Sequence, residues 1–102
     1  MSKKVLIVES RYYKDIADLL LEATIEQLNF YNVKFDKIEV LGALEIPILI
    51  KKAITLNKYD GFIALGCVIR GETSHYDIVS NYSAKALIDL AIDNTIPISN
   101  GI

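Results

Sequence analysis

A polar segment in the second half of the chain carries the residues best suited to chemistry. Residues 70–75 read RGETSH and separate a strongly apolar stretch from a segment with helical spacing. Backbone N–H groups at the start of a helix are unpaired and lie at the positive end of the helix dipole, so they can bind an anion. Gly71 would let that anion approach the backbone closely. Thr73 or Ser74 could equally be an ordinary helix cap, which is the commoner use of such residues.

The same segment ends in His75, the only histidine of the chain. An imidazole has an unperturbed pKa of about 6.5, which suits proton transfer at neutral pH. A solitary histidine is more often a surface residue or a hydrogen-bonded structural residue. Because His75 stands beside a candidate anion site, a catalytic role and a structural role are equally good interpretations.

Two further loops carry side chains that can contact a substrate. The first follows the apolar residues 5–8 and contains Tyr12, whose ring could stack on a planar heterocycle or pack against its neighbours. The second contains Glu45, whose carboxylate could accept hydrogen bonds from substrate hydroxyls or cap the helix that follows. Cys67 lies in an apolar strand and has no second histidine to activate it, so we expect a small buried side chain rather than a nucleophile.

Apolar periodicity predicts the elements that position these loops. Strands are expected at residues 5–8, 38–41 and 62–69, with a fourth beginning at residues 95–98, and helices are expected between them. The order βαβαβαβ implies parallel strands joined by right-handed crossovers, and hence an α/β fold, a three-layer sandwich with a parallel sheet and flavodoxin-like topology. Every strand-to-helix loop of such a sheet leaves at one edge, where ligands bind.

The composition bounds the class of protein. The chain has 102 residues, which suits a single domain over residues 1–102. Hydrophobic residues make up 52% and the mean hydropathy is +0.31, which is more than a small core can bury. We therefore expect subunit interfaces and no membrane insertion, since no apolar run approaches the roughly 18–20 residues of a spanning helix.

Charge and cysteine content narrow the class further. A net charge of −2 and a pI near 5.3 give no electrostatic basis for binding nucleic acid. Cys67 is the only cysteine, so it cannot form an internal disulfide, and the Cys/His spacing of a metal site is absent. The first apolar run stops at Glu9, which is too short for a signal peptide. We expect a cytoplasmic protein.

Three segments together resemble the lumazine synthase family. Arg11 and Tyr12 match an Arg–aromatic pair after the family's first strand. Residues 42–47 read GALEIP and match its GA-x-EIP segment, and residues 65–77 read LGCVIRGETSHYD and match its LG-x-VIRG-x-T-x-HYD block. The segments occur in the family's order and spacing, and the resemblance spans essentially the whole chain.

The resemblance implies an enzyme of riboflavin biosynthesis. Members condense 5-amino-6-(ribitylamino)uracil with 3,4-dihydroxy-2-butanone 4-phosphate to 6,7-dimethyl-8-ribityllumazine and release phosphate, without a cofactor or metal. Much of the acceleration is expected from holding the two substrates together. Members form homo-oligomeric pentamers with active sites between adjacent subunits, and some pentamers assemble into hollow shells.

The resemblance also implies roles for individual residues. Tyr12 matches the aromatic residue that stacks on the pyrimidine, and His75 matches the proton-transfer residue. The other matches form three groups: Ala43, Leu44 and Glu45 at the ribityl chain; Cys67, Val68 and Ile69 at the heterocycle, largely through backbone; and Glu72 and Thr73 in the phosphate loop.

The chain departs from the family pattern in three ways. Glu72 stands where a small residue is often found, and its charge would repel phosphate unless the side chain points away. Asn100 stands where many members place an aromatic ring that reaches into a neighbour's site, which implies a more polar wall. The family continues past residue 102 with its final helices and a phosphate-anchoring arginine, so we expect a C-terminally truncated domain.

Alternative functions share the layered architecture. A flavodoxin-like electron carrier needs a Ser/Thr/Gly-rich phosphate loop where residues 10–13 read SRYY. A phosphoacceptor receiver domain needs an aspartate where the third strand ends in GCVI. Both fit poorly. A non-catalytic lumazine- or flavin-binding oligomeric scaffold stays open, supported by Glu72 and the missing C-terminal part.

Overall fold

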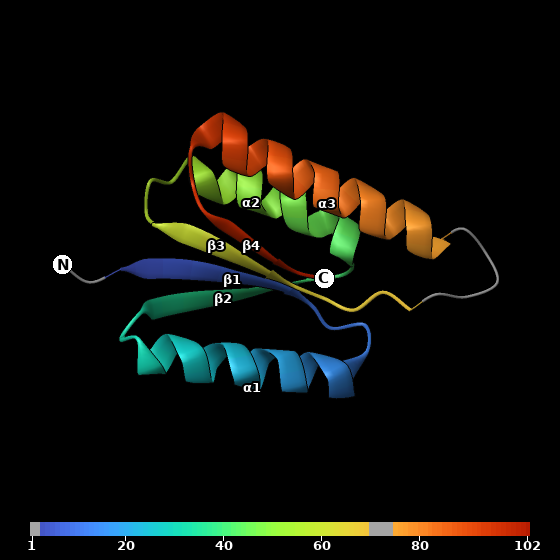
Figure 1. Ribbon diagram of the computed structural model, residues 1–102, viewed down its shortest axis with the longest axis horizontal. Coiled ribbons are helices and arrows are strands. Elements are labelled where there is room, and N and C mark those ends of the chain that lie inside the picture. Colours follow the sequence, from blue (N-terminus) through green and yellow to red (C-terminus); the bar gives the residue numbers. More distant parts are fainter. Residues whose placement is uncertain (1–2, 70–74) are drawn as a thin grey trace.

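The computed structural model of the protein describes residues 3–69 and 75–102 and contains four strands and three long helices (Figure 1). The strands are β1 (Lys4–Ser10), β2 (Lys34–Val40), β3 (Gly61–Leu65) and β4 (Ile98–Gly101). The helices are α1 (Lys14–Phe30), α2 (Ile46–Ile54) and α3 (His75–Asn94), and a 3-10 turn, η1 (Ala43–Glu45), precedes α2. The predicted alternation of strands and helices is confirmed.

The four strands form one parallel sheet in the order β2-β1-β3-β4. Helix α1 covers one face, while α2 and α3 lie together on the other (Figure 1). Each helix therefore connects two parallel strands, as a crossover must. The predicted three-layer α/β sandwich is confirmed.

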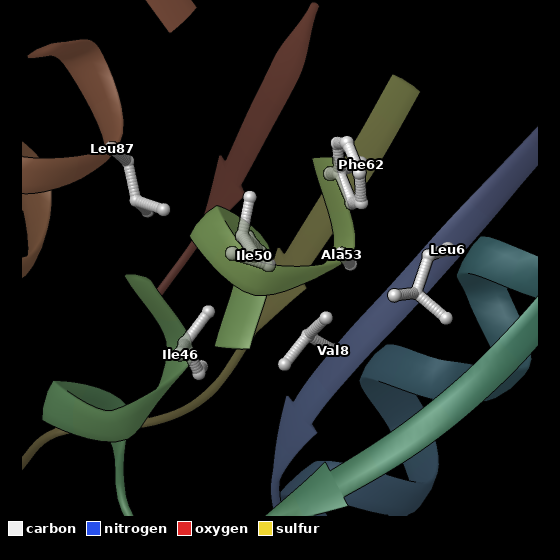
Figure 2. Packing of buried hydrophobic residues seen from close by; sticks show 8 residues of the cluster. Leu6, Val8, Ile46, Ile50, Ala53, Phe62 and Leu87 are labelled. Atoms are coloured by element: carbon white, nitrogen blue, oxygen red, sulfur yellow. The ribbon is translucent and has the colours of Figure 1, made fainter. Parts of the chain in front are cut away.

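The core lies between the sheet and α2, and strand β1 runs through its centre. Leu6, Ile7 and Val8 have no exposed surface, as expected for a strand covered on both faces. Figure 2 shows Leu6 and Val8 of β1 beside Ile50 and Ala53 of α2. The buried cluster comprises Leu6, Val8, Ile46, Ile50, Ala53, Phe62, Ala64 and Leu87.

Strand β3 is shorter than the apolar stretch of residues 62–69 predicts. It ends at Leu65, whose register partners are Glu9 of β1 and Gly101 of β4. Gly66 still donates a hydrogen bond to the carbonyl oxygen of Gly101 at 3.2 Å. Strand β4 ends at Gly101 and β1 continues only one residue further, to Ser10, so residues 67–69 have no partner strand to extend the ladder. Cys67 therefore lies in the loop after β3, and the prediction that it lies within a strand is wrong.

Strand β4 begins later than the apolar residues 95–98 suggest. Thr95 has a left-handed backbone conformation, with φ of 50°, and ends the turn that follows α3. The N–H of Ile96 donates a hydrogen bond to the carbonyl oxygen of Ala91 at 3.2 Å, which caps the carboxyl end of α3. The ladder can start only beyond this turn, at Ile98.

Large apolar side chains stay exposed on the outer helices. Leu19 of α1 is 67% exposed, and Tyr82 and Ile92 of α3 are 66% and 70% exposed. Within residues 3–69 and 75–102, no helix combines the length and apolarity needed to cross a membrane. The exposed side chains thus form apolar surface on a folded α/β domain.

Candidate active site

The loops that follow β1, β2 and β3 enclose a cavity of about 380 Å³ at the carboxyl edge of the sheet. Its lining consists of Ser10, Tyr12, Tyr13, Gly42, Ala43, Leu44, Glu45, Val68, Ile69 and Val79. This volume falls within the range of about 300–1,000 Å³ that is usual for small-molecule sites. Six of the side chains predicted from the sequence share this cavity: Tyr12, Ala43, Leu44, Glu45, Val68 and Ile69.

The first wall is an exposed aromatic ring. Tyr12 is 77% exposed and contacts Tyr13 edge to face, with ring centroids 5.0 Å apart and planes at 76°. The carbonyl oxygen of Tyr13 accepts the N–H of Ala17 at 2.9 Å, which opens helix α1. The Tyr12 ring is thus attached to the start of a helix while most of its surface stays open to a planar ligand.

The second wall is the turn η1. Ala43 is buried, and the backbone N–H of Glu45 donates to the carbonyl oxygen of Gly42 at 3.1 Å. The Glu45 side chain makes no capping hydrogen bond to α2. Its carboxylate folds back over Gly42, where an added Cβ would lie 2.8 Å from Glu45 Oε2. Of the two sequence interpretations, helix capping is therefore excluded, and the carboxylate lies at the cavity.

The third wall comes from the loop after β3. Val68 is half-buried and Ile69 is 50% exposed, and both line the cavity. Cys67 is half-buried and does not contribute to the lining. Asn100 lies on β4 opposite Ala64, outside the lining, and its side-chain oxygen accepts the N–H of Ile102 at 3.0 Å.

The remaining predicted residues belong to the loop that leads into α3. Glu72 and Thr73 lie outside the described residues, and of His75 the structure describes the backbone, which begins α3. Val79, one turn into α3, lines the cavity and is 5% exposed. The amino terminus of α3 therefore opens beside the cavity, where a helix end favours an anion.

Four of the lining residues are not among the predicted site residues, namely Ser10, Tyr13, Gly42 and Val79. Tyr13 and Gly42 directly adjoin the predicted residues Tyr12 and Ala43 in the sequence. Ser10 is the last residue of β1 and is 6% exposed, and Val79 lies one helical turn after His75. The sequence marks Ser10 and Val79 only by their positions. Ser10 is at the end of a strand before a loop, and Val79 is four residues after the candidate residue His75 on the same helix. Among residues 3–69 and 75–102, no cluster of His, Cys, Asp and Glu is placed to hold a metal ion.

Comparison with known proteins points to one family. Residues 2–102 match the family model described as 6,7-dimethyl-8-ribityllumazine synthase. The chain is 53% identical to the 6,7-dimethyl-8-ribityllumazine synthase of Agrobacterium fabrum, an alignment that covers 100% of this chain and 73% of that protein. Identity is 45% with the Nitrobacter hamburgensis enzyme of that name, covering 97% and 64%, and 49% with that of Methylobacterium nodulans, covering 97% and 58%. The chain thus spans 58% to 73% of the length of these relatives.

Proposed function

Because this chain belongs to the 6,7-dimethyl-8-ribityllumazine synthase family, we propose that it catalyses the condensation for which the family is named. The substrates are 5-amino-6-(ribitylamino)uracil and 3,4-dihydroxy-2-butanone 4-phosphate. The amine attacks the ketone to form a Schiff base, phosphate leaves, and closure of the second ring gives 6,7-dimethyl-8-ribityllumazine. The observation that carries the proposal is the single cavity shared by Tyr12, Glu45 and Ile69.

The pyrimidine and its ribityl chain occupy this cavity. The exposed Tyr12 ring stacks on the heterocycle, whose polar edge meets the backbone of residues 67–69. The ribityl chain runs along η1, where Glu45 accepts hydroxyl hydrogen bonds. This assignment is supported by the Glu45 carboxylate, which makes no capping bond and lies at the cavity.

The sugar phosphate binds at the amino terminus of α3. A helix amino terminus and its dipole favour an anion, so we assign the phosphate there, with Thr73 and the backbone at Glu72 as its ligands. His75, the first residue of α3, transfers the protons of Schiff-base formation and ring closure. Placing both substrates in one cavity supplies the effective concentration on which a two-substrate condensation depends.

We also propose that the protein is a cytoplasmic homo-oligomer, a pentamer or a larger shell, in which residues 1–102 contribute one domain. The support is the apolar surface of the outer helices, including Tyr82 and Ile92, which a partner subunit would bury. In such an assembly, Asn100 would face the site of the neighbouring subunit. Sedimentation of the purified protein tests this, and a monomer at micromolar concentration would contradict it.

Fluorescence of the product tests the catalytic proposal. The purified protein is mixed with both substrates, and lumazine formation is followed against the uncatalysed background. We expect turnover that saturates in each substrate. Tight binding of the pyrimidine without turnover would instead support the non-catalytic scaffold, and absence of binding would contradict both functions.

A further inference from the structure

A cluster of charged side chains lies beneath the β1–α1 loop, on the side of the sheet opposite the core. We call it the Glu9 cluster; its members are Glu9, Arg11, Asp18, Lys37 and Glu39. In β1, Leu6 and Val8 belong to the core against α2, so the alternating side chain of Glu9 points toward α1. Glu9 is only 1% exposed, which is rare for a carboxylate.

The two oxygens of the Glu9 carboxylate have different partners. Arg11 Nη1 donates a hydrogen bond to Oε1 at 2.6 Å. Oε2 lies 2.9 Å from Lys37 Nζ, an ion pair whose angles fall outside hydrogen-bond geometry. The buried Glu9 carboxylate is therefore oriented by its hydrogen bond from Arg11.

Arg11 connects the loop to three elements of the fold. Besides Glu9 of β1, its guanidinium donates a hydrogen bond to Asp18 of α1 and lies 3.8 Å from Glu39 of β2. Glu9 and Glu39 are register partners on adjacent strands, a repulsive arrangement that the guanidinium offsets. The Arg11 side chain is 18% exposed. Its planar fork can hold several carboxylates in fixed directions, which a lysine cannot do.

Such a cluster contributes more to geometry than to stability. Removing a carboxylate from water is unfavourable, and ion pairs typically only offset that cost. Tyr12 follows Arg11 directly and is 77% exposed, so side-chain packing does little to fix the ring. Its place on the cavity wall depends on how the loop backbone is held.

We infer that Glu9 is a positioning residue that acts through Arg11 to hold the β1–α1 loop, so that the Tyr12 ring stays in place to stack on the pyrimidine. The inference depends on the proposed function only in that the proposed function identifies the ligand as the pyrimidine. That Glu9 restrains the ring is a property of the free protein and can be tested without substrate.

The first experiment measures ring mobility. The chain has no tryptophan, so Tyr12→Trp introduces a single reporter, whose local rotation is read from fluorescence anisotropy decay. In this background Glu9→Gln should increase the amplitude of local rotation. Lys37→Met is the matched control, because it removes the partner of the other Glu9 oxygen, and among the described residues the ion pair of Lys37 is with Glu9 and not with the loop. Equal mobility in the two variants would overturn the inference.

The second experiment measures pyrimidine binding with Tyr12 intact. Glu9→Gln should weaken it about tenfold, less than the hundredfold that a displacement of ~1 Å can cost in catalysis. Lys37→Met should stay within about twofold of the parent. Arg11→Gln, which also removes the contacts with Asp18 and Glu39, should weaken binding at least as much as Glu9→Gln. The double variant should be no weaker than Arg11→Gln, because Glu9 acts through Arg11. Additive losses would overturn the inference.

The two experiments separate the possible failures. If the parent protein does not bind the pyrimidine, the proposed function fails, while the anisotropy result still decides the role of Glu9. If Glu9→Gln does not fold, Arg11→Gln replaces it in the anisotropy measurement, because the Arg11 side chain is partly solvent-exposed. Unchanged rotation of the reporter in Arg11→Gln then overturns the inference.

Discussion

The connections at the carboxyl and amino edges of the sheet use their polar side chains differently. At the amino edge, each helix reverses through one left-handed residue, namely Asn32, Asn57 or Thr95, with φ of 57°, 52° and 50°. Polar side chains there are used within the chain: the Asp60 carboxylate accepts the backbone N–H of Lys4 at 2.8 Å. The amino edge therefore uses these polar groups to close the fold.

At the carboxyl edge, side chains of the connections line the cavity instead of pairing within the chain. The Tyr12 ring is mostly exposed, and the Glu45 carboxylate makes no capping hydrogen bond. The two edges of the parallel sheet thus differ in what their side chains contact. Where helices return to strands, polar groups pair within the chain; where strands lead into helices, side chains are available to bind a ligand.

The largest effect should come from His75→Ala at the carboxyl edge. Loss of a general acid–base residue should lower kcat by about a hundredfold or more, while the dissociation constant of the pyrimidine changes little. Single-turnover kinetics together with equilibrium binding measure the two quantities. Loss of pyrimidine affinity with unchanged turnover of the bound complex would contradict the assigned role.

Tyr12→Ala compares the two edges directly. Removing a ring that stacks on a base should weaken pyrimidine binding about tenfold or more, with little change in unfolding free energy because the ring is exposed. Tyr31→Ala is the matched control: Tyr31 is 69% exposed and contacts Phe30 edge to face at 5.0 Å, at the other end of α1. Comparable losses of affinity in both variants would refute a stacking role.

Gly42→Ala tests whether the Glu45 carboxylate at η1 binds the ribityl chain. Gly42 has φ of −146° and ψ of 170°, so alanine fits the backbone, but its Cβ would displace the Glu45 carboxylate. Losing one charge-assisted hydrogen bond to a ribityl hydroxyl should weaken pyrimidine binding about tenfold. An analogue without hydroxyls on its side chain should bind parent and variant alike. If the variant weakens both compounds equally, Glu45 does not bind the ribityl chain.

At the amino edge, Thr95→Gly should stabilise the fold without altering catalysis. A β-branched residue at φ of 50° is strained, and glycine relieves that strain at some cost in chain entropy. We expect a net gain of about 0.5–1 kcal/mol in unfolding free energy, measured by urea denaturation. Activity should stay unchanged, and a change in substrate affinity would show that the two edges are coupled.

The smallest effect concerns pH at the amino edge. Tyr59 donates a hydrogen bond to Asp36 at 2.6 Å, and this bond, with burial and the charge of Asp36, raises the pKa of Tyr59 to about 12. Because the folded pKa exceeds the unfolded value of 10.0, the stabilisation is present below pH 10 and is lost as the pH rises toward 12. Tyr59→Phe should therefore show a shallower loss of stability over this range. Identical slopes in parent and variant would contradict it.

The sequence predicted the order of elements and the shared edge because these follow from apolar periodicity and the geometry of crossovers. Where a strand ends depends instead on its partners: β3 stops at Leu65 because β1 and β4 stop beside it. Residues 67–69 look like strand in composition but have no neighbour to pair with. Strand limits of this kind are a property of the sheet and are not encoded locally.

The Glu9 cluster shows a second limit of sequence reasoning. A charged residue after an apolar run suggests that the buried segment has ended, yet Glu9 is 1% exposed. Its burial depends on Lys37 in another strand and on Arg11, which turns back from the loop. The partners of a buried charge become visible only when the strands are paired.

Hydrogen–deuterium exchange with and without 6,7-dimethyl-8-ribityllumazine tests the central claim most directly, because it reports both edges of the sheet in one measurement. Amides of residues 11–13, 43–45 and 67–69 should gain protection on binding, while the turns at Asn32, Asn57 and Thr95 should exchange as before. Binding that protects those turns, or leaves the three carboxyl-edge loops unprotected, would contradict the account.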